Sequence, residues 1–421
     1  MVKSGRDSAT AQQNLIIMLS FFVYASAYVG RYSFSSSINS FIDRYGIGKS
    51  ETGLVMTFFF VAYGIGQVIN GFLCKYYPKR YIFPVALFIS SIINLVLFIG
   101  IETGYVGNYF YLVKYIWALN GMGQSLIWTS IVYTLGENIE QKNLPRSGLV
   151  IGLTVPVGTF VAYSMSSLTV HFGHFELSFV LAAVIMSGVG VIWLMLFKPY
   201  QRTDIKPDTE TEKETGKKSG SKMPAYILIT VIGLSVFAIA NNFIKDGLQT
   251  WIPTILKDTY SFSASASLML AMSIYILGVC GTILVKKIHN YISDFVILCV
   301  IFFSVMSALI GGIRIFLNVS AVPVTVLFGA VIIGGYAVNN IVTSIAPLFL
   351  RDYLNPGISA GILDGFCYIG SAITTYALGA VVENSKGGEW GTAIMLLLTV
   401  SVFSTVTALL LKLIKVKKSE V

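Results

Sequence analysis

Long apolar runs separated by short polar stretches are the dominant pattern along the chain. Residues 81–101 and 322–333, for example, contain no charged side chain. The hydrocarbon core of a bilayer needs about 20 apolar residues per spanning helix, and the runs are too numerous for one soluble core to cover. The pattern predicts an all-α polytopic membrane protein with about twelve transmembrane helices, at residues 14–37, 52–74, 81–101, 108–135, 147–170, 175–197, 224–256, 264–285, 292–312, 319–347, 357–382 and 390–413.

Charged residues are scarce and unevenly placed. They make up 12% of the chain, against about 25% in a typical soluble domain. With the N-terminus inside, 21 of the 29 lysines and arginines fall in the inner segments and five in the outer loops. Because basic residues are enriched on the cytoplasmic side of membrane proteins, we expect an inner-membrane protein with both termini in the cytoplasm. The net charge of +9 therefore does not indicate a nucleic-acid partner.

The longest hydrophilic segment divides the chain into two halves. Residues 202–222 have mixed charge and no apolar periodicity, which is typical of a linker. The predicted organisation is a cytoplasmic N-terminus (1–13), an N-terminal six-helix bundle (14–197), a cytoplasmic linker (198–223), a C-terminal six-helix bundle (224–413) and a cytoplasmic tail (414–421).

The two halves resemble each other weakly. Four short matches recur in chain order at an offset of 212 to 214 residues. Such a series favours duplication, and duplicated six-helix halves joined by a central linker are typical of the major facilitator fold. The matching positions are Arg31 with Lys245, Tyr63 with Tyr275, Asn120 with Ile333, and Ser147 with Ala360.

Two basic residues lie near the middle of the membrane. Arg31 precedes Asp43 by 12 residues, and Lys245 precedes Lys257 by the same number. An arginine at that depth costs roughly 2.5–3.5 kcal/mol on insertion scales unless it faces water or a partner. Two cations at equivalent depths predict one central clamp for an anion. The alternative is a structural ion pair, for instance of either cation with Asp364.

Other polar residues add to this site. Tyr24, Tyr28 and Arg31 share one helix face at spacing i, i+4, i+7, so the two phenols are expected to wall an anion pocket or to pack between helices. Asp246 follows Lys245 directly, and adjacent helical residues point about 100° apart, so we do not expect both to point squarely at the cavity. Asp364 is the acid lying well inside the eleventh helix, where it pairs with a cation or takes up a proton.

Catalytic and cofactor-binding patterns are missing from the sequence. The four cysteines form no CxxC pair and are expected to pack between helices. No nucleotide-binding loop, metal-ligand cluster or nucleophile set is present. We therefore expect no enzyme activity, no cofactor and no metal.

Several motifs resemble the organophosphate:phosphate antiporter family of the major facilitator superfamily, which includes glycerol-3-phosphate and hexose-6-phosphate transporters. The resemblance implies that Arg31 grips the substrate phosphate and that Tyr24, Tyr28, Tyr63 and Tyr368 line its pocket. The motifs are Tyr24-x3-Tyr28-x2-Arg31-x2-Phe34, Ala62-Tyr63-Gly64, Trp251-x-Pro253, and the stretch from Ala360-Gly361 to Tyr368-x-Gly370.

The chain also departs from that family. Lys245 stands where members usually carry arginine, and Gln67 stands where glycerol-3-phosphate transporters have lysine. Their histidine in the fifth helix, near Pro156, is missing. The 62–71 stretch with Gln67 also resembles the anion:cation symporters for sugar acids.

These observations predict a secondary active transporter that moves a small organic anion by alternating access. The leading hypothesis is exchange of a sugar phosphate or glycerol phosphate for inorganic phosphate. The alternative is proton-coupled symport of a carboxylate sugar acid, with Asp364 carrying the proton. A hypothesis of another class is a membrane receptor that binds such an anion without moving it. In each case the partners are the anion and the lipid bilayer, and a monomer is expected.

Overall fold

The computed structural model of the chain describes residues 2–200, 225–350 and 356–419. These residues are almost entirely helical. The predicted linker, apart from residues 198–200, and the last residues of the predicted tail lie outside the described residues. The helices are α1 (Val2–Tyr45), α2 (Lys49–Leu73), α3 (Lys79–Glu102), α4 (Tyr105–Asn108), α5 (Phe110–Asn138), α6 (Leu144–Gly152), α7 (Thr154–His171), α8 (Leu177–Leu196), α10 (Ala225–Tyr260), α11 (Ala264–Tyr275), α12 (Gly278–His289), α13 (Phe295–Phe316), α14 (Ala321–Asn340), α15 (Ala346–Phe349), α16 (Pro356–Glu383) and α17 (Trp390–Ser419), with short turns η1 (Cys74–Tyr76), η3 (Ile341–Ile345) and η5 (Lys386–Gly388).

Each predicted span coincides with one helix or with a series of short ones. The first span was predicted too short, because α1 continues beyond the apolar run as far as Tyr45. Its later polar residues face neighbouring helices: the Ser36 hydroxyl lies 2.6 Å from that of Ser166 on α7. The fifth span divides into α6 and α7 at Leu153. Pro156, three residues later, has no N–H for the carbonyl of Gly152.

Eleven helices among the described residues are long and apolar enough to cross a membrane. The span formed by α5 is not one of them, because it carries several buried polar side chains, including Asn120, Gln124 and Thr134. Large apolar side chains are exposed on the outside of the bundle, such as Phe72, at 60%, and Val326, at 67%. Exposed apolar surface on this scale marks contact with a membrane.

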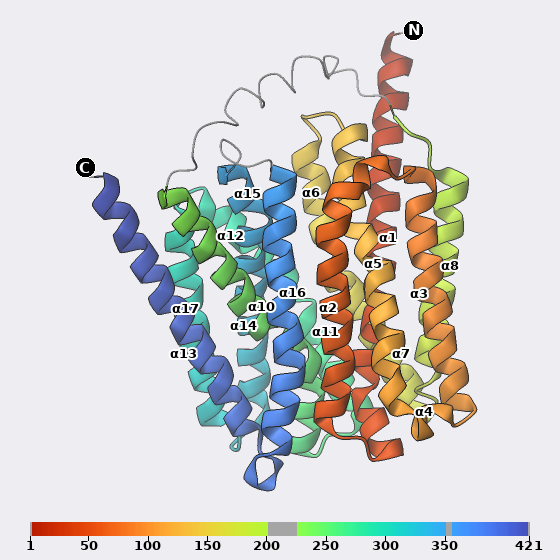
Figure 1. Ribbon diagram of the computed structural model, residues 1–421, viewed down its shortest axis with the longest axis vertical. Coiled ribbons are helices and arrows are strands. Elements are labelled where there is room, and N and C mark those ends of the chain that lie inside the picture. The colour runs from red at the N-terminus through yellow and green to blue at the C-terminus, as the bar shows by residue number, and fades with distance from the viewer. Residues whose placement is uncertain (1, 201–224, 351–355, 420–421) are drawn as a thin grey trace.

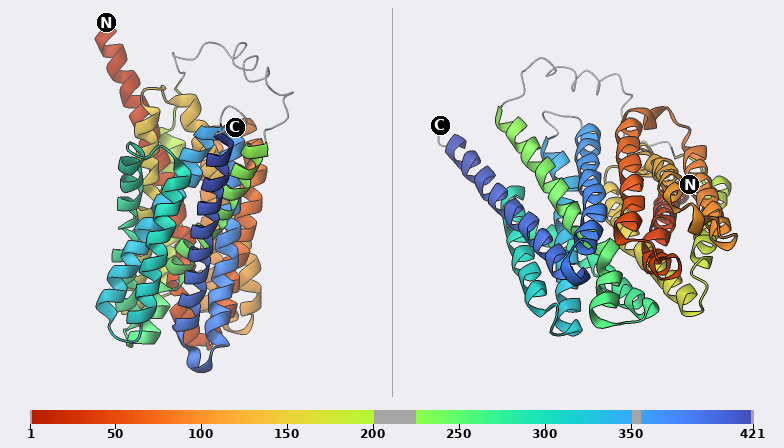
Figure 2. Two further views of the ribbon diagram at one scale, coloured as in Figure 1. Left: turned by 90° about the vertical axis from the view of Figure 1, so that its left-hand side faces the viewer. Right: turned by 60° about the horizontal axis from the view of Figure 1, so that its bottom comes forward.

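The two halves of the chain stand side by side as two helix bundles (Figure 1). The helices before residue 200 lie mainly on the right of that view and those after residue 225 mainly on the left, and the right-hand view of Figure 2 also keeps them apart. The start of α1 and the end of α17 lie at the same end of the molecule, which we call the terminal end.

The seam between the halves is formed mainly by α2 against α16 and by α7 against α11. Glycines allow the α2–α16 contact: a Cβ on Gly379 would lie 2.6 Å from the carbonyl oxygen of Lys49. Farther along the same seam the Thr57 hydroxyl donates to the carbonyl of Ala372 at 2.7 Å. Small residues of this kind let helix backbones approach closely in lipid.

The end opposite the terminal end is closed by polar contacts between the halves. Lys257 pairs with Asp43, and Lys49 lies 3.1 Å from Asp258. The backbone N–H of Ser50 donates to Glu383 at 2.9 Å. These contacts join α1 and α2 to α10 and α16, so the halves meet at this end.

Candidate functional site

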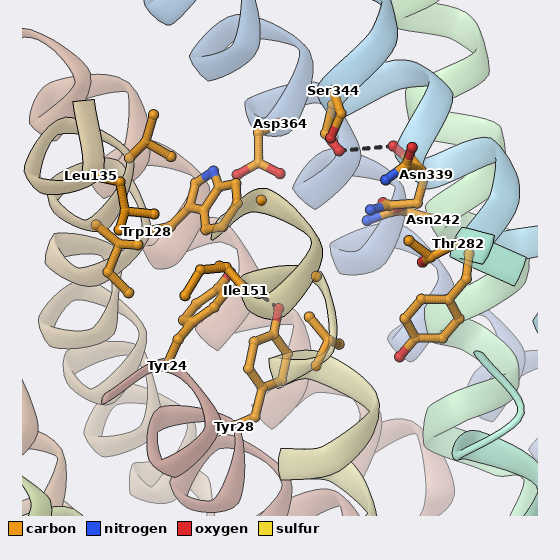
Figure 3. A pocket seen from close by; sticks show the side chains of 18 of the residues that line it. Tyr24, Tyr28, Trp128, Leu135, Ile151, Asn242, Thr282, Asn339, Ser344 and Asp364 are labelled. Atoms are coloured by element: carbon orange, nitrogen blue, oxygen red, sulfur yellow. Dashed lines mark hydrogen bonds between the residues drawn. The ribbon is translucent and has the colours of Figure 1, made fainter. Parts of the chain in front are cut away.

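A cavity of about 430 Å³ lies between the two halves, and both contribute to its wall. Tyr24, Tyr28 and Trp128 face Asn242, Asn339 and Ser344 across it (Figure 3). Other lining residues come from α6 and α12, which lie toward the terminal end (Figure 1). The candidate residues from the sequence that line it are Tyr24, Tyr28, Arg31, Lys245, Asp246, Asp364 and Tyr368.

Arg31 is a buried cation held by aromatic rings. Its side chain is 2% exposed, and its guanidinium carbon lies 4.4 Å from the centre of the Tyr28 ring and 4.3 Å from that of Tyr63. Nε donates to Gln124 at 3.3 Å, and Nη1 donates to the Tyr368 hydroxyl at 3.4 Å. Ring faces attract a cation, so these contacts orient the guanidinium.

The charge of Arg31 has no counter-ion among the described residues. No carboxylate oxygen there lies within 4.0 Å of it, and its Nη2 is buried without a hydrogen-bond partner. An uncompensated buried charge is strongly unfavourable. The guanidinium therefore offers a donor, at the wall of a cavity, that an anion would satisfy.

Lys245 is placed differently. Its Nζ lies 2.7 Å from Oδ1 of Asp246, and both residues line the cavity. Both neighbours line the cavity although they lie about 100° apart on the helix, because the long lysine side chain folds back to its neighbour. Oδ2 of Asp246 also accepts from Ser371 at 2.5 Å and from Asn242 at 3.2 Å. The pair is thus fixed in place and neutral overall.

Asp364 lines the cavity without an ion pair. The alternative that Arg31 or Lys245 pairs with it is not what the structure shows, since no ion pair of Asp364 within 4.0 Å occurs in the described part of the chain. Its Oδ2 is buried and has no hydrogen-bond partner there.

The tyrosines from the sequence occupy two layers. Tyr24 and Tyr28 line the cavity with their hydroxyls 3.3 Å apart. Tyr63 does not line the cavity: it is fully buried behind Arg31, with its ring 4.4 Å from that of Tyr368. Gln67 also lies outside the cavity wall and donates to the Tyr63 hydroxyl at 2.8 Å. Tyr63 and Gln67 thus support the arginine from behind.

Several residues of the site were missed at the sequence level. Gln124 contacts Arg31 directly, and the Trp128 ring stacks on Tyr24 at 5.2 Å. On the other half, Asn339 and Asn340 interrupt an apolar span. In both spans, a polar residue inside an apolar run was the sequence feature that could have identified these residues as part of the site.

The floor of the cavity is a polar contact centred on the side chain of Gln249, on α10. The Tyr32 hydroxyl, from the first half, donates to its Oε1 at 3.4 Å. Its Nε2 donates to the Tyr336 hydroxyl at 3.1 Å. Since Tyr32 and Tyr336 line the cavity, this contact separates it from the closed end.

The backbone carbonyl of Gln249 joins the halves as well. Pro253, four residues later, lies inside α10 and cannot donate the usual helical hydrogen bond to it. Instead it accepts from the hydroxyls of Tyr163, on α7, and Tyr275, on α11, each at 2.8 Å. One of these donors comes from each half.

Comparison with known proteins places these features in a family. The model of the Major Facilitator Superfamily matches residues 20–347. The glycerol-3-phosphate transporter of Bacillus subtilis (strain 168) is 23% identical over 67% of this chain and 66% of its own length. The glucose-6-phosphate exchanger SLC37A2 of Mus musculus is 22% identical over 79% of this chain and 74% of its own length. The hexuronate transporter of Bacillus subtilis (strain 168) is 23% identical over 67% of this chain and 64% of its own length. The match thus spans slightly less than two thirds of two of these relatives.

Solved structures share the fold. A bacterial homolog of the human lysosomal transporter Spinster, in an inward-facing and unoccupied conformation, superposes with a TM-score of 0.69 at 14% identity, over 95% of both chains. The D-xylose-proton symporter gives 0.69 at 13% identity, over 94% of this chain and 96% of that one. At such identities these likenesses concern the fold alone.

Proposed function

Because the chain belongs to the major facilitator superfamily, we propose that it carries a small organic anion across the membrane by alternating access. The predicted fold class, two six-helix bundles of the major facilitator type, is confirmed. The family and the relatives are transporters, so the expectation that the chain is not an enzyme is confirmed as well.

The observation that carries this proposal is the buried guanidinium of Arg31. It has no counter-ion among the described residues and its Nη2 has no partner there. A carboxylate or phosphate accepts two parallel N–H bonds from such a fork. An anion bound there would remove the energetic penalty of the unpaired charge, which favours binding at mid-membrane.

In the leading version, a sugar phosphate or glycerol phosphate is exchanged for inorganic phosphate. The substrate anion binds Arg31, with Tyr24, Tyr28 and Tyr368 around it and with Tyr63 positioning the guanidinium. The glycerol-3-phosphate and glucose-6-phosphate relatives support this version.

A second candidate is proton-coupled symport of a carboxylate sugar acid. The Lys245–Asp246 pair favours it, because a neutralised lysine leaves Arg31 as the cation free to meet the substrate, and a carboxylate carries one charge. The unpaired Asp364 would hold the coupling proton. The hexuronate transporter among the relatives supports this version.

A counterflow screen tests the function. Purified protein in proteoliposomes preloaded with phosphate is challenged with radiolabelled sugar phosphates and sugar acids. Exchange that requires internal phosphate supports the first version, and uptake driven by a proton gradient supports the second. Binding by calorimetry with no flux in either assay would instead indicate a receptor.

Asp364→Asn separates the two transport versions. If Asp364 carries the proton, the variant loses uphill uptake and keeps exchange of internal for external substrate. A phosphate exchanger with this substitution keeps most of its antiport. Gel filtration of the variant in detergent establishes that it is folded.

We also propose that the terminal end faces the cytoplasm, with bundles at 14–197 and 224–413 joined by a cytoplasmic linker at 198–223. The positive-inside distribution of basic residues supports this orientation. The cavity then opens inward. In a variant without native cysteines, an impermeant thiol reagent added to intact cells should label a cysteine at Asn384 and spare one at Lys142, two exposed positions at opposite ends.

A further inference from the structure

The cavity wall from the C-terminal half carries buried acceptors that nothing in the described structure satisfies. Oδ2 of Asp364 and Oδ1 of Asn340 are both buried and lack a hydrogen-bond partner there. Both residues line the cavity. A buried polar atom without a partner costs about 1–3 kcal/mol, so each oxygen marks a place where a bound ligand would donate a hydrogen bond.

A local distortion brings more polar groups to the same wall. The helix that begins as α14 changes to a π-helical turn, η3, directly after Asn340. Such turns are rare and occur frequently at functional sites. Within it, Thr343 and Ser344 line the cavity together with the preceding Asn339. Ser344, Asn339 and Asp364 are seen on this side of the cavity in Figure 3.

We call Asn339, Asn340, Thr343, Ser344 and Asp364 the acceptor wall. It differs in chemistry from the wall around Arg31. The unsatisfied atom at Arg31 is a donor, and those of the acceptor wall are acceptors. An unprotonated phosphate or carboxylate oxygen cannot serve as a donor to them. The group that meets this wall must therefore carry O–H or N–H.

We propose that the acceptor wall is a hydroxyl-binding subsite, so that the ligand is a polyhydroxylated anion with its charged end at Arg31 and its hydroxyls at Asn340 and Asp364. This inference rests on the proposed function. A hydroxyl fits better than an ammonium group because four of the five wall residues are neutral. The volume of about 430 Å³ lies within the usual range for small-molecule sites.

The test compares anions matched in charge that differ in hydroxyl groups. The probes are glycerol 3-phosphate against ethyl phosphate, and gluconate against hexanoate, titrated into the full-length protein in detergent by calorimetry. In at least one pair the hydroxylated member should bind about tenfold more tightly. Ethanolamine phosphate, which carries an ammonium group, is the third arm.

Substitutions then locate the effect. Asn340→Ala should weaken the hydroxylated probe about fivefold and leave its hydroxyl-free partner within about twofold, since one neutral hydrogen bond is lost. Ser344→Ala provides a second, smaller deletion in the same wall. Asn384→Ala is the matched control, because Asn384 is exposed at the closed end and bonds only to the carbonyl of Ala380 in the described structure.

Two results would overturn the subsite. If the matched probes bind equally, or if Asn340→Ala weakens the binding of both members of a pair alike, the acceptor wall does not bind the hydroxyl groups. If ethanolamine phosphate binds most tightly, the wall is a cation site. Arg31-dependent binding of ethyl phosphate or hexanoate would leave the proposed function standing in either case. If none of the anions binds, the proposed function fails, and the subsite fails with it.

Discussion

Arg31 and Lys245 occupy equivalent positions in the two halves and have opposite electrostatic surroundings. The offset between them is 214 residues, and both line the cavity. Arg31 sits among rings without a counter-ion in the described residues, whereas Lys245 contacts Asp246 at 2.7 Å. Each half thus places a cation at this position, and the two halves differ in what that cation can bind.

One neighbouring residue accounts for much of this difference. At the same offset of 214, the position of Asp246 corresponds to Tyr32. The second half therefore carries its own counter-ion beside the cation, and the first half carries a phenol that binds Gln249 instead. We infer that the first half supplies the strong anion contact and that the second half supplies mainly neutral recognition.

The largest effect is expected at Arg31. Arg31→Lys keeps the charge and loses the planar fork, so the Kd for the substrate should rise about ten- to hundredfold, from the roughly 1.5–3 kcal/mol of a charged hydrogen bond. Arg31→Ala should raise the Kd further, because the charge is lost as well. Calorimetry in detergent measures Kd, and melting without ligand is the control. A variant that binds the substrate normally but melts at a much lower temperature would show that Arg31 is a structural residue. The contrast drawn between Arg31 and Lys245 would then no longer concern anion binding.

The counter-ion test should give an effect of opposite sign. Asp246→Asn removes the charge that neutralises Lys245, so inorganic phosphate should bind about tenfold more tightly. The ligand-free variant should also melt earlier, because its lysine is then buried without a counter-ion. Unchanged phosphate affinity would mean that Lys245 is out of reach of the ligand even when unpaired. Ser385→Ala, at the closed end, serves as a folding control.

The smallest effect is expected for Lys245→Arg. The new guanidinium keeps the charge and can pair with Asp246 through its fork. Anion affinity should therefore change by less than about threefold, with any gain greater for phosphate esters than for carboxylates. Titration of both ligand types against wild type checks this. A tenfold gain would contradict this expectation, because it would mean that the guanidinium binds the anion although Asp246 is still present.

Much of this architecture could be predicted from hydropathy and charge. The twelve spans and the paired depths of Arg31 and Lys245 follow from one-dimensional patterns, because the bilayer imposes a fixed length on each helix. The contact of Lys245 with Asp246 could not be predicted from the 100° step alone, since a lysine side chain reaches far around its helix. The position of Tyr63 behind Arg31 depends on how α2 packs against α1, which no local pattern encodes.

The carbonyl of Gln249 has a consequence for the kinetics of opening at the closed end. A backbone oxygen stripped of its partner in a membrane costs several kcal/mol, and such a cost would add to the activation barrier for separating the halves. Here the oxygen freed by Pro253 has two donors, Tyr163 from one half and Tyr275 from its own. When Tyr163 withdraws with its half, Tyr275 remains bonded. The contact can therefore stabilise the closed state without adding the cost of an unpaired backbone oxygen to the activation barrier for opening.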